Sequence, residues 1–155
     1  NDFVAVLQLR PGVEKDSSAV EWIAYASNAF NTLAPFYPMV DETPEYLSNT
    51  TGDASTENFY WASRMIAAMT DASYGRSVFH AERYQESVMA KSHQILNRYD
   101  ALLNKETDPA KCQEIRQRAN EEVASMLKKE ATDTLNKVLY ELSNQMKNAY
   151  SRSDA

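Results

Sequence analysis

The sequence predicts an α+β fold made of a short N-terminal β-hairpin, a proline-rich loop, a buried helix and a long antiparallel helical hairpin. Two apolar runs of strand length open the chain, at residues 3–10 and 19–26. From residue 76 onward, apolar residues recur instead at three-and-four spacing along two long stretches. A chain of 155 residues with 43% apolar residues is long enough to bury one modest core.

The first strand, residues 3–10, has apolar side chains on both faces and ends at the turn signal Pro11-Gly12. A strand that is buried on both faces belongs inside a sheet, with a neighbour on each edge. Only one further convincing strand follows, at residues 19–26. We therefore expect the hairpin to be part of a larger sheet, with further strands outside this chain.

The next segment, residues 27–54, is too rich in proline for regular structure and predicts an ordered loop. Its aromatic residues indicate that the loop packs against a core: Phe30, Phe36, Tyr37 and Tyr46. A helix is expected from Asn58 to Met69, with Asp53, Ser55 or Thr56 as its N-cap. Because Arg64 is its only charged residue, this helix is apolar nearly all round and requires burial on several sides.

Two longer helices complete the chain, one over residues 76–105 and one that begins at Pro109 and continues to about Ala149. Thr107-Asp108-Pro109 supplies a cap followed by proline at the first helical position. About 40 residues without glycine or proline correspond to a rod of roughly 60 Å. The short connection makes the two helices antiparallel neighbours. We therefore divide the chain into residues 1–75 and a helical hairpin over residues 76–155.

Composition excludes several classes of protein. The formal charge of −6 and the pI near 4.9 argue against nucleic-acid binding and against a polybasic membrane anchor. No apolar stretch approaches the ~20 residues that span a bilayer. The single cysteine, Cys112, cannot form an internal disulfide, which favours the cytoplasm and leaves secretion open. Its place on the apolar side of the last helix indicates a packing role.

Few residues suggest catalytic or metal chemistry. His80 and His93 lie 13 residues apart on one helix and cannot bind the same metal ion, and Asp41, Glu42 and Glu45 read as a solvated loop. The chain has no zinc spacing, phosphate loop or dinucleotide motif, so we expect neither a metal nor a cofactor.

Arg10 is the one candidate substrate-binding residue. It ends the first strand, where a fixed guanidinium can bind a carboxylate or stabilise an oxyanion. The alternative is that Arg10 pairs with a structural acid.

Three segments resemble the C-terminal portion of the cysteine-type bacterial dipeptidases, in the N-terminal-nucleophile hydrolase superfamily. They are VLQLRPGV, VEWIAYASNAFNTLAPFYPMVDETPEYL and STENFYWASRMIAAM. The resemblance covers about residues 4–70 and assigns residues 1–75 to the hydrolase core. It implies a thiol peptidase that acts on dipeptides, with the N-terminal cysteine of the processed chain as nucleophile, its α-amino group as base, and a four-layer sandwich around both.

This sequence begins with Asn1, which has neither a thiol nor a hydroxyl. We therefore expect the nucleophile to lie in an N-terminal region outside this chain, and the chain alone to be inactive. Two alternatives remain: a noncatalytic helical interaction module, and a related acylase that hydrolyses other amides. Unpaired strand edges and apolar helix faces also predict a homo-oligomer.

Overall fold

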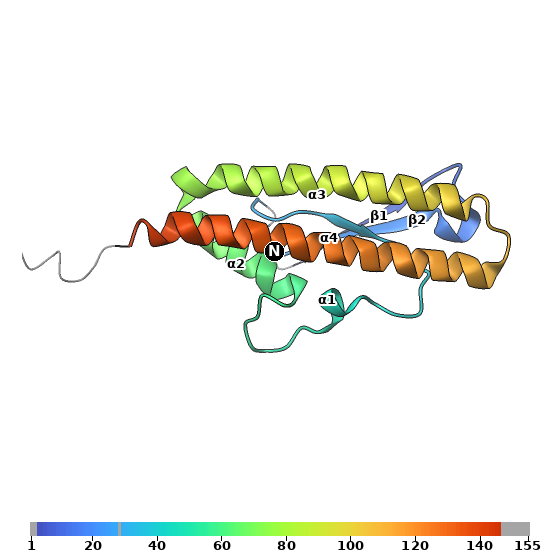
Figure 1. Ribbon diagram of the computed structural model, residues 1–155, viewed down its shortest axis with the longest axis horizontal. Helices are drawn as coiled ribbons and strands as arrows, with labels where there is room; N and C mark the ends of the chain where they lie inside the picture. The colour runs from blue at the N-terminus through green and yellow to red at the C-terminus, as the bar shows by residue number, and fades with distance from the viewer. Residues whose placement is uncertain (1–2, 28, 147–155) are drawn as a thin grey trace, which may run out of the picture.

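The computed structural model describes residues 3–27 and 29–146 and confirms the α+β fold (Figure 1). Its strands are β1 (Phe3–Leu9), β2 (Ala19–Tyr25) and β3 (Ala34–Phe36), and a short 3-10 helix spans Lys15–Ser17. Its α-helices are α1 (Glu45–Ser48), α2 (Phe59–Ala72), α3 (Tyr74–Leu103) and α4 (Pro109–Ser143).

The three strands form an antiparallel sheet in the order β1-β2-β3. Phe3 lies opposite Tyr25 and Leu9 opposite Ala19, which confirms the predicted hairpin. The expectation of an irregular segment over residues 27–54 is wrong in part, because this segment contains β3 and α1. β3 is short and carries Pro35, a residue that strands accept only at edges, so its sequence resembles a loop.

The predicted burial of β1 on both faces is wrong for the described residues. Phe3, Leu7 and Leu9 lie on one face by strand alternation, and they are 51%, 66% and 71% exposed. No residue of β1 belongs to either core cluster, so its side chains are left uncovered. β1 also lies at the edge of the sheet, with β2 as its only strand neighbour in the part of the chain that the structure describes. β1 therefore presents both a free edge and an apolar face.

Helix α2 begins after Asn58, not after the three predicted caps. The Oδ1 atom of Asn58 accepts a hydrogen bond from the Trp61 backbone N–H at 2.9 Å, which satisfies a donor of the first turn. One side of α2 is fully buried, through Phe59, Ala62 and Ile66. The row that continues from Trp61 is half-buried or exposed, so burial on all sides is not observed.

The predicted helical hairpin is confirmed, and Figure 1 shows α3 and α4 side by side along the length of the molecule. Asp108 caps α4 by accepting the Ala110 N–H at 3.0 Å, with Pro109 next to it. The 35 residues of α4 correspond to ~52 Å, shorter than expected. The predicted end near Ala149 lies outside the described residues. No helix in residues 3–27 and 29–146 is long and apolar enough to cross a membrane.

The apolar side of the hairpin packs against the sheet and α2 within the same chain. Two clusters form this core, and each contains residues from the strands and from both long helices. The first includes Ile23, Phe36, Phe59, Val88, Ile95, Val123 and Leu127, and the second includes Val20, Trp22, Leu96, Leu103 and Ile115. Most of the apolar surface for which we expected an external partner is therefore covered inside the chain.

Asn120 on α4 fixes the loop after β3. Its side chain accepts the Tyr37 N–H at 2.8 Å and donates to the Tyr37 carbonyl at 2.9 Å, and both residues are buried. One turn earlier, Gln117 makes the same pair of bonds to Glu42 at the surface, at 3.3 and 2.9 Å. Asn120 therefore holds the Tyr37 end of this loop segment in the core, and Gln117 holds the Glu42 end at the surface.

Asn120→Ala is expected to lower the free energy of unfolding by about 3 kcal/mol, because it leaves two buried backbone groups unpaired. Gln117→Ala is the matched control and should cost about 0.5 kcal/mol, because water replaces its bonds. Urea denaturation followed by circular dichroism measures both values. Equal losses would show that the burial of the Asn120 bonds does not matter.

Glu130 on α4 joins the two long helices. Its carboxylate accepts hydrogen bonds from Lys91 and, at 2.8 Å, from Ser87. Burial is the largest single influence and raises the pKa of Glu130, but the two bonds and the positive charge of Lys91 together bring the pKa below its ordinary value of 4.5. The carboxylate therefore stabilises the folded state at neutral pH.

A carboxyl group with a lowered folded-state pKa contributes stability above its unfolded-state pKa and loses it as the pH falls through the folded value. The free energy of unfolding should therefore fall as the pH drops below about 4.5. Glu130→Gln should make this fall shallower while lowering stability at pH 7, as measured by urea denaturation between pH 7 and 3. An unchanged acid slope in the variant would contradict this assignment.

Candidate functional site

Arg10, the predicted substrate-binding residue, lies just after β1 and pairs with Asp100 on α3. Its guanidinium contacts both carboxylate oxygens, at 2.5 and 3.1 Å, and donates to the Ser17 carbonyl at 2.8 Å. Both side chains of the ion pair are about 15% exposed. This is the bidentate geometry in which arginine holds a carboxylate most firmly.

Tyr37 completes the Arg10 cluster. Its hydroxyl donates to Asp100 at 2.6 Å, and its ring centroid lies 5.6 Å from the Arg10 guanidinium. Burial and the neighbouring Asp100 carboxylate raise the pKa of Tyr37, so it remains a neutral donor. Since both carboxylate oxygens of Asp100 are bound, the geometry matches the structural alternative. A role for Arg10 in substrate binding stays a prediction.

Cys112 is buried in the second core cluster, and its thiol donates weakly to the Glu106 carbonyl at 3.8 Å. Burial and the nearby Glu14 raise the pKa of Cys112, which disfavours the reactive thiolate. His80 lies 3.9 Å from Glu141, and the His93 ring packs on Trp22 at 5.4 Å between centroids.

The three acidic residues are solvated as expected, but Glu45 begins helix α1 instead of lying in a loop. Asp41, Glu42 and Glu45 are exposed. Among residues 3–27 and 29–146, no group of three histidine, cysteine or carboxylate side chains is placed to hold a metal ion.

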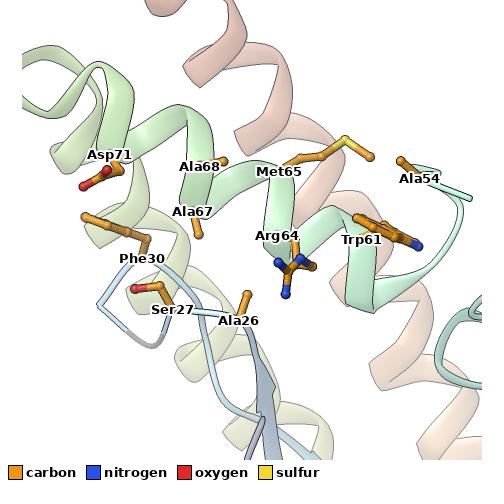
Figure 2. Close-up of a pocket in the computed structure, with 10 residues that line it drawn as sticks. All are labelled: Ala26, Ser27, Phe30, Ala54, Trp61, Arg64, Met65, Ala67, Ala68 and Asp71. Atoms are coloured by element: carbon orange, nitrogen blue, oxygen red, sulfur yellow. The ribbon is translucent and has the colours of Figure 1, made fainter. Parts of the chain in front are cut away.

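A groove of about 840 Å³ lies between α2 and the segment that follows β2 (Figure 2). Its lining combines small and apolar residues with one cation and one anion. The lining residues are Ala26, Ser27, Phe30, Ala54, Trp61, Arg64, Met65, Ala67, Ala68 and Asp71. Figure 2 shows Arg64, Ala67 and Asp71 directed from α2 toward the segment that carries Ala26 and Phe30.

Arg64 is held between two aromatic rings on its own helix. Its guanidinium lies 5.5 Å from the Tyr60 ring centroid and 5.8 Å from that of Trp61, and it donates to the Tyr60 hydroxyl at 3.3 Å. The rings are themselves fixed: Tyr60 packs edge-on against Tyr25, and the Trp61 indole donates to the Thr51 carbonyl at 2.9 Å. Arg64 thus has a defined position at the groove.

The opposite wall of the groove is anchored to α3. The Gln85 side-chain amide donates to the carbonyls of Ala29 and Asn31, at 3.1 and 2.9 Å. Phe30 packs edge-on against Tyr74 at 6.2 Å. Both walls therefore depend on contacts outside the groove itself, which is typical of a preformed site.

Ala26 turns the chain from β2 into this wall with φ of 60°, the only positive φ of a non-glycine residue among residues 3–27 and 29–146. The left-handed conformation costs an alanine about 1 kcal/mol. Such strain occurs most often where a functional geometry requires it. The sequence contained one relevant signal, the lone charge Arg64 on an apolar helix, but gave no indication that β2 lies opposite it.

Comparison with known proteins identifies the class as a peptidase family. The family model described as "Peptidase family C69" matches residues 1–87, which contain the sheet, α1, α2 and the groove. This match covers more than half of the chain. The chain therefore belongs to peptidase family C69.

Curated bacterial relatives carry consistent names. "Probable dipeptidase A" of Streptococcus pyogenes serotype M18 is 38% identical over 97% of this chain and 31% of its own length. "Dipeptidase" of Bifidobacterium longum is 36% identical over 97% of this chain and 35% of its length, and "Probable dipeptidase B" of Lactococcus lactis is 32% identical over 99% and 32%. The chain thus spans about a third of the length of these relatives.

Arg10→Lys is expected to lower the free energy of unfolding by about 1 kcal/mol, because lysine keeps the charge but loses the bidentate contact. Urea denaturation measures this loss. If Arg10 binds substrate instead, the full-length protein would lose at least ~10-fold in kcat/KM with its unfolding unchanged. That second outcome would contradict the structural assignment.

Proposed function

We propose that this chain is the C-terminal part of a cysteine-type dipeptidase that hydrolyses small peptides. The observation that carries the proposal is the C69 match over residues 1–87, together with relatives that are named dipeptidases along nearly the whole chain. In this proposal, residues 1–75 contribute strands, loop and α2 to the hydrolase core. The hairpin of α3 and α4 supports them as the second unit, within residues 76–155, and the protein is cytoplasmic.

The catalytic nucleophile in this proposal is a cysteine that lies outside this chain. Cys112 is 5% exposed, and its raised pKa opposes formation of a thiolate. A nucleophilic thiol needs a base within hydrogen-bond distance, whereas the Cys112 sulfur contacts a backbone carbonyl. The chain alone is therefore expected to be inactive.

The test is hydrolysis of leucyl-leucine by the full-length protein. We expect release of free leucine, its loss after thiol alkylation, full activity in a Cys112→Ala variant, and no turnover by the present chain alone. Absence of hydrolysis by the full-length protein would contradict the dipeptidase assignment. Cleavage of N-acyl amides without cleavage of dipeptides would support the acylase alternative, and loss of activity in Cys112→Ala would contradict an external nucleophile.

The edge of β1 is the proposed contact through which this chain, when produced alone, forms a homo-oligomer. Its exposed apolar face and free edge favour pairing between two copies. The hairpin is a weaker candidate because its apolar side is already packed, although Leu139 is 54% exposed. The backbone N–H of Arg10 donates to the Ser18 carbonyl, so by antiparallel alternation the even positions face β2 and Leu7 faces the free edge.

Leu7→Pro is therefore expected to convert the isolated chain to monomers, because it removes an outward N–H donor. Val6→Pro is the matched variant. Because the Val6 N–H faces β2, this substitution should destabilise the pairing of β1 with β2 as well as the association between copies. Leu139→Glu should leave the association unchanged. Sedimentation velocity at micromolar concentrations separates these outcomes, and dissociation by Leu139→Glu alone would assign the interface to the helical hairpin.

A further inference from the structure

We propose that the part of the full-length protein outside this chain contributes an amphipathic helix that packs beside α3 and covers one face of β1. The inference rests on the proposed function only because it takes this chain as part of a longer protein. The surface concerned lies between β1 and α3, and we call it the β1–α3 ledge. Its floor includes Val4, Val6 and Trp22, and its wall consists of Gln85, Met89 and His93.

The floor of the ledge belongs to the face of the sheet that α3 covers. Val6 lies directly opposite Trp22, and directly opposed residues of antiparallel strands point to the same face. Trp22 shares a core cluster with Leu96 and Leu103 of α3 and is 7% exposed, whereas Val6 is 48% exposed. The apolar face of the sheet therefore continues past the part that α3 covers.

The ledge is hollowed and is most apolar at its middle. Two adjoining hollows of about 300 and 350 Å³ share Leu33 and Met89. Polar side chains belong to one hollow or the other and not to the shared part, with Gln85 in the first hollow and Gln8 and His93 in the second. A partner that fits this surface has an apolar face with polar side chains on either side of it.

The spacing of the layers favours a helix as this partner. Helices pack about 8–10 Å apart, which is close to twice the ~4.8 Å between neighbouring strands. A helix packed against α3 on the side of β1 would therefore lie above the edge of β1 and reach Val6 from there. A second sheet on this face would have to occupy the layer that α3 already fills, because sheets also pack ~10 Å apart.

The free edge of β1 indicates where the helix comes from. This chain spans about a third of the length of its curated relatives. β1 has a strand neighbour on one side only in the part of the chain that the structure describes. A strand added at the other side would widen the apolar floor further, so the segment that supplies this strand also requires a helix to cover it.

The experiment measures how fast N-ethylmaleimide reacts with single cysteines introduced into the full-length protein. Val6→Cys and His93→Cys place a thiol on the floor and on the wall of the ledge. Ala90→Cys is the matched control, because Ala90 is exposed on the same helix and lies outside both hollows. Mass spectrometry of the labelled peptides distinguishes each site from Cys112 and from other thiols.

A covered ledge should slow the labelling of Val6→Cys and His93→Cys at least ~10-fold in the folded protein relative to the protein in urea, and that of Ala90→Cys less than ~2-fold. Unfolding temperatures identify any variant that fails to fold, and the two ledge positions lie on different elements, so either one decides the result. Rapid labelling of the ledge cysteines in the folded protein would overturn the inference, as would equal protection of Ala90→Cys.

A photoreactive benzoylphenylalanine in place of Val6 or His93 identifies the occupant. We expect cross-links within one copy, to a single segment outside this chain, at positions three and four apart, as on one side of a helix. Cross-links between two copies, or to alternate positions of a strand, would overturn the inference.

Hydrolysis of leucyl-leucine by the same full-length protein keeps this inference separate from the proposed function. Protected ledge cysteines in a protein without hydrolysis would contradict only the dipeptidase assignment. Hydrolysis by a protein whose ledge cysteines react rapidly would overturn only the helix.

Discussion

The packing of the sheet against the α3–α4 hairpin is the interaction on which the rest of the structure depends. Val20 and Trp22 of β2 share a cluster with Leu96 and Leu103 of α3, and the neighbouring Ile23 belongs to the other cluster. Apolar burial stabilises this contact by ~25 cal/mol for each Å² removed from water, but it has little directional preference. It brings the layers together without fixing how the loops lie on them.

Polar contacts fix the loops on this core. Arg10 pairs with Asp100 across 90 positions, Tyr37 with Asn120 across 83, and Asn31 with Gln85 across 54. Each contact joins the N-terminal segment to a long helix, and each requires a narrow range of distance and angle. The wall of the groove is held by Gln85, so its position follows that of α3. This links the stability of the hairpin to the shape of the site.

Elements with local determinants could be predicted from the sequence, and elements with distant partners could not. The hairpin follows from apolar spacing, and Asp108-Pro109 marks the start of α4 because a cap acts on the turn that follows it. β3 depends on pairing with β2, and the groove depends on Arg64 meeting Ala26 across the fold. For Arg10 the sequence offered a structural pair as an alternative, but nothing near it identified Asp100 as the partner.

A crystal structure of the full-length protein with a ketomethylene analogue of leucyl-leucine tests the central claim most directly, because the analogue keeps both charged ends and cannot be hydrolysed. The account predicts that the analogue lies beside a cysteine outside this chain, and that the sheet of β1, β2 and β3 continues past the edge of β1 into the rest of the full-length protein. Binding of the analogue beside Cys112, or a β1 edge without a strand neighbour in the full-length protein, would contradict the account.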